Sequence, residues 1–280
     1  MHEQDNGILW KHTIAKTERA VVARMRELVV QFVVTLGNYE YVFAYKLDQA
    51  GGITLETRAT GIVSVVAIDY GKKSQYGTVV QDGVLAQNHQ HLIAVRIDPA
   101  IDSYAEGDTG VVVEESKAME MNEKTNPFGN AYEVVRTPVE KAGWFDAEPK
   151  LNRKITMVNW NKTNKHSGRY IGYKFMPEPT QLILADPRSR VAKRALFAQH
   201  HVWVTGHRDD ELWAAGEFTN LSKHEVGGVA DMVNRGDWFL DSLEIGVNKD
   251  NDAKARKSSP VIWNVFGLTH NPRVEDWPVM

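Results

Sequence analysis

The histidines at positions 89 and 91 have the residue type and the spacing of a metal site. They stand in the run Asn88-His89-Gln90-His91, which leads into the apolar stretch LIAVRID. Side chains two residues apart in an extended strand project to the same face, so both imidazoles share one face. Their Cβ atoms would lie roughly 6 to 7 Å apart, which lets one nitrogen of each ring approach a single ion at about 2 Å. The alternative is a pair of partly exposed, hydrogen-bonded histidines without a metal.

His270 is the strongest candidate for a third ligand from a distant part of the chain. The apolar, strand-like run VIWNVFGLT precedes it, and a turn that contains Pro272 follows. Other histidines lie in polar surroundings, while His200 and His201 are adjacent and would face opposite sides of a strand. Three imidazoles suit Cu(II) or Zn(II). The chain contains no cysteine, which excludes thiolate-held zinc, iron–sulfur clusters and disulfides.

Two tyrosines follow the most hydrophobic run of the chain. This run, LVVQFVVTL, covers residues 28–36 and continues into TLGNYEY, residues 35–41. From the residue types alone, Tyr39 and Tyr41 are ordinary aromatic residues of a half-buried strand. Any chemical role for them must be argued from other parts of the sequence.

Composition and charge restrict the class of protein. The 280 residues include 33 Lys and Arg against 36 Asp and Glu, giving a net charge of −3. Such a balance gives no basic field for binding nucleic acid. The first residues lack the apolar stretch of a signal peptide, and no run approaches the ~18 apolar residues of a membrane span. We expect one intracellular domain over residues 1–280, and the composition does not choose between the cytoplasm and the peroxisome.

The segments that must position these residues are predicted to be mostly β-strands. Short β-branched runs bounded by polar turns occur at residues 28–36, 53–60, 61–68, 92–98, 110–115, 155–160, 170–175, 181–185 and 202–205. The nearly continuous apolar runs 28–36 and 61–68 are typical of strands covered on both faces. Helices are predicted from Asp186-Pro187 to residue 199 and over residues 224–235. Residues 246–259 read as an exposed, mobile loop. The fold is therefore predicted to be mainly β.

The sequence resembles the copper-containing amine oxidases from end to end. TLGNYEY is similar to the family consensus Thr-x-x-Asn-Tyr-Asp/Glu-Tyr, and NHQHLIAVRID resembles the family's His-x-His copper strand. MHEQDNGILWKHT, NPFGNAYE, LILADPRSRVAKRALFAQHHVWVT, AAGEF and GLTHNPRVEDWPVM resemble further family segments in the same order. The resemblance implies a large antiparallel β-sandwich, the catalytic domain of that family.

The resemblance also implies a cofactor, a reaction and a partner. By similarity, Tyr39 is the precursor of topaquinone (TPQ), Asn38 restrains the cofactor ring, and His89, His91 and His270 bind Cu(II). The implied activity is oxidation of a primary amine with O₂ to an aldehyde, ammonia and hydrogen peroxide. Members are homodimers with hairpin arms, for which residues 110–175 are the candidates.

Three departures from the family pattern leave alternatives open. The catalytic Asp of the family lies upstream of the quinone tyrosine in an Asp-Ala-Gly-Glu-like signature that this chain lacks, and both ends look truncated. At a peripheral Ca(II) site, Asp98 matches, but Ala100 and Ser259 replace the usual carboxylates, which argues against that site. The alternatives are a copper-binding but catalytically impaired fragment or relative, and a metal-free β-sandwich binding module.

Overall fold

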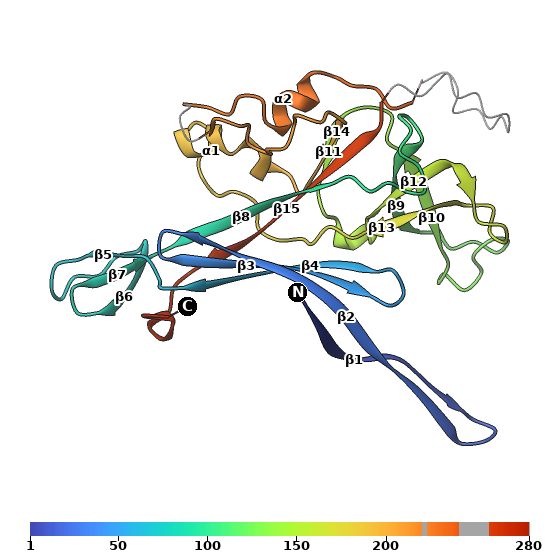
Figure 1. The fold of residues 1–280 in the computed structure, drawn as a ribbon, viewed down its shortest axis with the longest axis horizontal. Coiled ribbons are helices and arrows are strands. Elements are labelled where there is room, and N and C mark those ends of the chain that lie inside the picture. The colour runs from blue at the N-terminus through green and yellow to red at the C-terminus, as the bar shows by residue number, and fades with distance from the viewer. Residues whose placement is uncertain (220–222, 241–257, 280) are drawn as a thin grey trace. The chain divides into compact units, whose positions relative to one another are not determined.

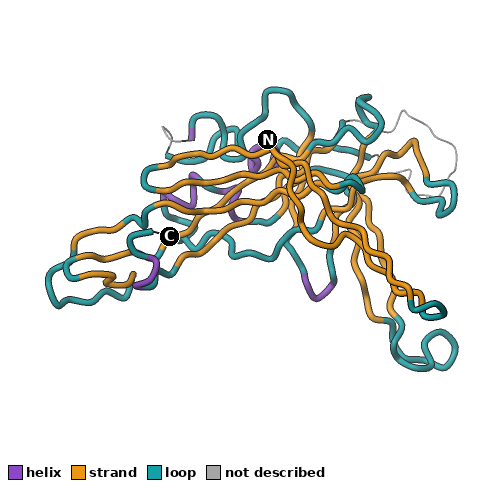
Figure 2. Tube along the Cα trace, turned by 60° about the horizontal axis from the view of Figure 1, so that its bottom comes forward, coloured by secondary structure: helices purple, strands orange, loops and turns teal. Residues whose placement is uncertain are grey.

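A computed structural model describes residues 1–219, 223–240 and 258–279 of the chain. Strands dominate these residues and the helices are short, as Figure 2 shows. The strand pairs whose register is recorded are antiparallel, which confirms the predicted mainly β, antiparallel fold. The chain divides into two compact units, residues 1–89 with 270–280, and residues 90–269.

The first unit contains a four-stranded sheet in the order β1-β2-β3-β4 and a three-stranded sheet in the order β5-β7-β6. In the first sheet the strands are β1 (His2–Ile14), β2 (Arg19–Leu36), β3 (Tyr39–Asp48) and β4 (Ile53–Gly61). In the second they are β5 (Val65–Ala67), β6 (Gly77–Gln81) and β7 (Val84–Gln87). Val63, Val80 and Ala86 form a small buried cluster, against which Trp277 of the C-terminal segment packs. This unit positions Tyr39.

The second unit contains two four-stranded sheets (Figure 1). One has the order β10-β9-β12-β13, with β9 (Thr109–Ala118), β10 (Tyr132–Pro138), β12 (Lys154–Thr163) and β13 (Tyr170–Phe175). The other has the order β11-β14-β15-β8, with β8 (His89–Ile97), β11 (Gly143–Phe145), β14 (Val202–Gly206) and β15 (Pro260–His270). Their shared core includes Val111, Ile155, Val204 and Ile262, so the two sheets pack as a sandwich.

The first predicted helix is shorter than expected and begins later. Ser189, rather than Asp186, is its N-cap, because the Ser189 side chain accepts a hydrogen bond from the Ala192 N–H. The segment splits into α1 (Arg190–Arg194) and the 3₁₀ helix η2 (Leu196–Gln199). The second predicted helix is limited to α2 (Val229–Asn234). Of the predicted loop at 246–259, residues 246–257 lie outside the described residues.

Two strand predictions are wrong for identifiable reasons. Residues 181–185 form no strand, because the Gln90 side chain bonds to the Leu182 carbonyl and the Leu184 N–H in place of a neighbouring strand. Residues 61–68 do not form one strand either. The backbone turns at Gly61, whose φ of +115° ends β4. Ile62 then makes an isolated bridge with Val279, and Val65–Ala67 pair as β5.

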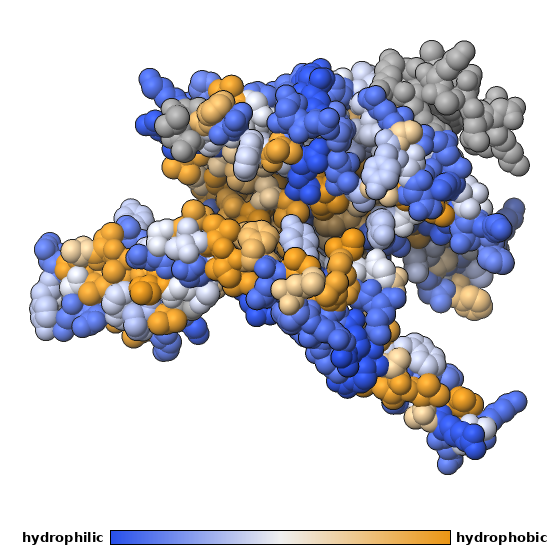
Figure 3. Space-filling model, in the orientation of Figure 1, coloured by the Kyte–Doolittle hydropathy of each residue, from blue (hydrophilic) through white to orange (hydrophobic). Residues whose placement is uncertain are grey.

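The apolar run 28–36 is a strand, as predicted, but it is not covered on both faces. Val29 is buried, whereas Leu28, Phe32, Val33 and Leu36 are exposed. Exposed apolar side chains also occur farther along the β1–β2 hairpin, which Figure 3 shows as orange atoms near its tip. Packing in the core of the described residues therefore does not account for the hydrophobicity of this run.

Candidate metal and cofactor site

A tight hairpin sets the position of Tyr39. β2 and β3 are joined by a two-residue turn, in which Gly37 has a φ of +62° and Leu36 pairs directly with Tyr39. A glycine with positive φ at the first turn position is typical of a type II′ hairpin, which suits the twist of the flanking strands. On its other side Tyr39 pairs with Gly61 of β4. Tyr39 is therefore held from both sides in the interior of the sheet, and its side chain is 9% exposed.

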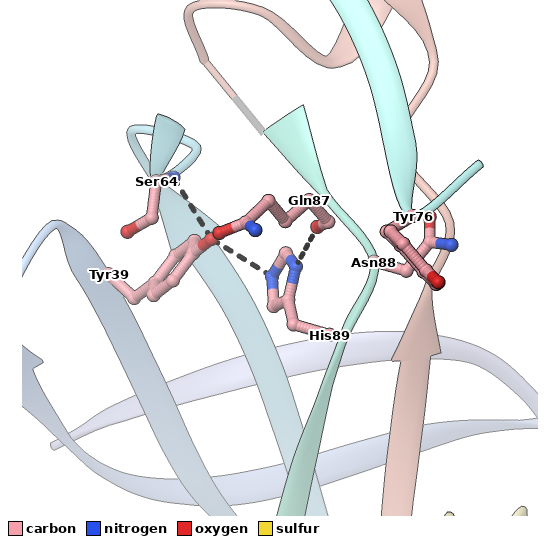
Figure 4. Close-up of a pocket in the computed structure, with 6 residues that line it drawn as sticks. All are labelled: Tyr39, Ser64, Tyr76, Gln87, Asn88 and His89. Carbon is pink, nitrogen blue, oxygen red and sulfur yellow. Dashed lines mark hydrogen bonds between the residues drawn. The ribbon is translucent and has the colours of Figure 1, made fainter. Parts of the chain in front are cut away.

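The hydroxyl of Tyr39 contacts two groups of the same unit. Its oxygen lies 2.9 Å from Nε2 of His89, and the Ser64 backbone N–H donates to it over 3.0 Å (Figure 4). The rings of Tyr39 and His89 are stacked, with centroids 5.5 Å apart. The phenol is thus held against an imidazole nitrogen that could bind a metal.

The second nitrogen of His89 fixes the state of the first. Nδ1 lies 2.8 Å from the Gln87 carbonyl oxygen, which can only accept a hydrogen bond. The proton of the neutral ring therefore resides on Nδ1, and Nε2 keeps its lone pair. In this arrangement the Tyr39 hydroxyl donates to Nε2. The same lone pair could bind a metal ion.

His89, His91 and His270 come together as the sequence predicted. Each offers one ring nitrogen, and these nitrogens all lie within 4.8 Å of one another. His89 begins β8 with His91 two residues farther on, and His270 ends the neighbouring strand β15. The rings of His89 and His270 meet edge to face at 5.0 Å. Among the described residues this is the one group of histidine, aspartate or glutamate side chains arranged to hold a metal ion.

His270 provides the structural evidence that a metal fits. Its Nε2 lies 3.0 Å from Oδ2 of Asp276, which requires a proton on Nε2. Its Nδ1 is buried and has no hydrogen-bond partner among the described residues. A buried ring nitrogen with a lone pair and no partner is costly unless something binds it. A Cu(II) or Zn(II) ion held by three imidazoles would satisfy it.

Asp276 was not singled out in the sequence, and the structure assigns it a place beside the site. It lies at the end of the 3₁₀ helix η5 (Val274–Asp276), six residues after His270. The Arg273 guanidinium, and then His270 and the Arg273 N–H, hold the pKa of Asp276 well below its usual range. The carboxylate is therefore ionised and acts only as an acceptor toward His270.

A pocket of about 360 Å³ opens beside Tyr39 and His89. Its other lining residues are Ser64, Tyr76, Gln87 and Asn88 (Figure 4). None of these six residues carries a carboxylate, so the described part of the chain offers no acid or base of that type in the pocket.

The other residues considered in the sequence are Asn38, Asp98, His200 and His201, and none of them belongs to the group of three converging histidines. Asn38 is exposed in the β2–β3 turn, and its backbone carbonyl accepts the Ile62 N–H at 2.8 Å. Asp98 lies 3.2 Å from Arg96 Nη1 and 3.0 Å from His207 Nε2, so a guanidinium and an imidazole flank its carboxylate. His200 and His201 both contact Asp146 at 3.1 Å.

Comparison with known proteins identifies the family. The sequence profile described as "Copper amine oxidase, enzyme domain" matches residues 1–280. Copper amine oxidase 1 of Aspergillus niger is 57% identical over 280 residues, which is 100% of this chain and 39% of that protein. The peroxisomal primary amine oxidase of Pichia angusta is 32% identical, over 100% of this chain and 39% of that protein.

A solved structure agrees with the sequence matches. The crystal structure of a copper-containing benzylamine oxidase from Hansenula polymorpha superposes with a TM-score of 0.89 at 42% identity, covering 100% of this chain and 41% of that one. The chain thus spans well under half the length of the relatives it matches.

The chain belongs to the copper amine oxidase family. Members of this family use copper and topaquinone, and the three converging histidines could hold the metal. Some relatives are peroxisomal by name. In the described residues, no helix is both long and apolar enough to cross a membrane.

Proposed function

We propose that this chain carries the copper and cofactor site of a primary-amine oxidase. The proposed reaction takes a primary amine, O₂ and water to an aldehyde, ammonia and hydrogen peroxide. The observation that carries the proposal is the Tyr39 hydroxyl oxygen, 2.9 Å from Nε2 of one of three converging histidines. Bound there, copper would supply Lewis acidity and electron transfer beside a phenol.

The proposed residue roles follow from the geometry and the family. His89, His91 and His270 bind copper, Tyr39 becomes topaquinone, and Asn38 restrains the cofactor from the hairpin turn. Conversion of tyrosine to topaquinone adds two oxygen atoms to the ring and removes two hydrogens. This six-electron oxidation consumes two O₂ and releases one H₂O₂, so no oxidant other than O₂ is needed.

The test is cofactor formation in the purified chain. Loading with copper in air should produce visible quinone absorbance that shifts on reaction with phenylhydrazine. Tyr39→Phe should abolish both signals. Tyr41→Phe is the matched control, because this second phenol lies in the same strand with its ring centroid 6.4 Å from that of Tyr39. Retention of the quinone in Tyr39→Phe would refute the assignment of Tyr39.

A second candidate function is a copper-binding chain that turns over poorly. The pocket without a carboxylate favours it, since loss of a general base commonly costs roughly 10² to 10⁴ in rate. Oxidation of methylamine or benzylamine with sustained peroxide release by the copper-loaded chain would eliminate this candidate. Formation of a quinone that reacts with phenylhydrazine but does not turn over amine would support it.

We propose that residues 1–280 act as one catalytic domain and associate as a homodimer. The family profile covers the whole chain without interruption, and strands β8 and β15 each contain residues of both compact units. The hairpins β9–β10 and β12–β13 cover most of residues 110–175, where arms toward a partner are predicted. Sedimentation of the purified chain as a monomer at micromolar concentration would contradict the dimer.

We further propose a cytoplasmic or peroxisomal location and no nucleic-acid or membrane partner. The names of relatives support the peroxisome, and the net charge of −3 gives no basic field. Microscopy of the tagged protein against a peroxisomal marker tests the location. Accumulation in the medium or at the cell surface would contradict it.

A further inference from the structure

Three consecutive backbone N–H groups after β4 donate hydrogen bonds, and the third of them donates to the Tyr39 hydroxyl. The Ile62 N–H donates to the Asn38 carbonyl at 2.8 Å, and the Val63 N–H donates to the Pro278 carbonyl at 3.2 Å. The Ser64 N–H donates to the Tyr39 hydroxyl at 3.0 Å. One short segment thus contacts the turn before Tyr39, the tail that follows His270, and the phenol itself.

Gly61 gives this segment its path. Its φ is +115°, a conformation that side chains of L-residues rarely adopt. A Cβ at this position would lie 2.4 Å from the Asn38 oxygen and 3.0 Å from Cα of Tyr39. Because the glycine has no Cβ, β4 can pair with Tyr39 at Gly61 and then turn so that residue 64 faces the hydroxyl of the same tyrosine. Val63, fully buried, anchors the turn in the small core cluster.

We propose that the Ser64 backbone amide positions the Tyr39 phenol for conversion to topaquinone. This rests on the function proposed above. The phenol oxygen accepts from Ser64 and donates to His89 Nε2. Two directional contacts restrict rotation of the hydroxyl and of the ring, so the oxygen faces the nitrogen that would bind copper. Without the Ser64 contact, the ring would retain more freedom.

The side chain of residue 64 has no part in this role. Ser64 is exposed, and the contact with Tyr39 uses its main-chain N–H. Ser64→Ala keeps this N–H donor and is therefore the reference variant for the tests below.

The hydrogen bond itself is tested in the metal-free protein. Hydrogen exchange of the Ser64 amide, followed by NMR with ¹⁵N-serine, should become roughly three- to tenfold faster in Tyr39→Phe. The Val63 amide, followed with ¹⁵N-valine, serves as the internal control and should not change, because its acceptor is Pro278. Unchanged exchange at Ser64 would overturn the proposal, and equal acceleration at both amides would indicate loosening of the segment and overturn it too.

The positioning role is tested by replacing one amide with an ester. An α-hydroxy acid at position 64 removes the N–H donor, and Ser64→Ala is the reference that keeps it. With copper saturating in both, the ester should form quinone roughly tenfold more slowly or worse, while its copper affinity stays within about twofold of the reference. An ester at position 63, which removes the bond to Pro278, is the matched control and should form quinone at the reference rate.

The outcomes separate this inference from the proposed function. Equal rates for the position-64 ester and Ser64→Ala would overturn the positioning role while the cofactor assignment stands. Slowing by the position-63 ester to the same extent would overturn it as well, since the effect would then be one of general folding. If no variant forms a quinone, including Ser64→Ala, the proposed function fails, and the role in cofactor formation fails with it.

Discussion

Asp276 engages one nitrogen of the His270 ring and leaves the other for a metal. The contact from Nε2 to Oδ2 is 3.0 Å, and the carboxylate is itself held by the backbone and guanidinium groups of Arg273. A carboxylate that accepts from a ligating histidine fixes its ring orientation and makes its other nitrogen a better ligand. Copper affinity should therefore depend on a residue that does not touch the ion.

Asp276→Asn is predicted to weaken copper binding roughly 10- to 100-fold. The asparagine side chain lacks the negative charge that keeps a proton on Nε2 of His270. The tautomer with a lone pair on Nδ1 is then no longer favoured. Competition with a chelator of known affinity measures the effect. Glu275→Gln removes a neighbouring exposed carboxylate of η5 and should bind copper like the parent. Equal affinities for both variants would show that Asp276 does not orient the ligand.

At the residue scale, candidate functional side chains could be predicted from the sequence, but contacts made by backbone groups could not. His89 and His91 could be named from their spacing and His270 from the apolar run before it, whereas Tyr39 was named only through the resemblance to the family. The contribution of Ser64 comes from its N–H, a group that every residue except proline carries. Asp276 follows His270 after a proline turn, and only the turn's path brings the two together.

At the scale of elements, one buried carboxyl links three short helices. Glu225 is 5% exposed, its side chain accepts from the Phe197 and Ala230 N–H groups, and its own N–H donates to the Lys193 carbonyl. These partners belong to η2, α2 and α1. Burial, the largest cause, raises the pKa of Glu225 to about 7.

The stability of this region should fall as the pH rises from about 4.5 to 7. The folded state holds the proton more tightly than the unfolded state, so the neutral carboxyl stabilises the fold fully below about 4.5, the ordinary value, and not above about 7. The free energy of unfolding should drop by about 3 kcal/mol across this range. Urea unfolding at pH 5 and pH 8 measures the change.

Glu225→Gln should flatten that pH dependence, because the amide does not titrate. Glu217→Gln removes an exposed carboxylate from the same part of the chain and should preserve the parent's slope. A parent protein whose unfolding free energy does not change between pH 5 and pH 8 would contradict the assignment of a raised pKa to Glu225.

Strands with β-branched runs were predicted well, and their interruptions were not. β13 has the predicted bounds, and β14 extends one residue beyond the prediction. The break at residues 62–64 was missed because it depends on the φ of Gly61 and on acceptors distant in sequence, Asn38 and Pro278. At residues 181–185, hydrogen bonds with the Gln90 side chain take the place of those with a neighbouring strand. No local sequence pattern indicates such a contact.

At the scale of the whole molecule, one face of the first sheet carries several exposed apolar side chains. Leu28, Phe32 and Leu36 of β2 lie opposite Leu47, Phe43 and Tyr39 of β3, so they share a face. Phe32 is 50% exposed and stacks on Phe43 at 5.2 Å, and Leu36 is 61% exposed. The opposite face carries Glu27 and the Lys46–Glu56 ion pair. Exposed apolar side chains grouped in this way favour association.

Phe32→Glu is predicted to weaken self-association of the purified chain by roughly tenfold or more, because a charge replaces apolar surface that contact would cover. Sedimentation velocity over a concentration series measures it. Tyr104→Glu introduces the same charge at a position 96% exposed and outside this sheet, and should leave association unchanged. Identical behaviour of the two variants would place the contact elsewhere.

The two-residue turn before Tyr39 has a consequence for protein production. Side chains alternate between the faces of a strand, so a slip of one residue between β2 and β3 would send the phenol to the opposite side, away from His89. A chain with this wrong strand register could then not form the proposed topaquinone. The ratio of visible to ultraviolet absorbance in a copper-saturated preparation would report the fraction of molecules whose hairpin has closed correctly.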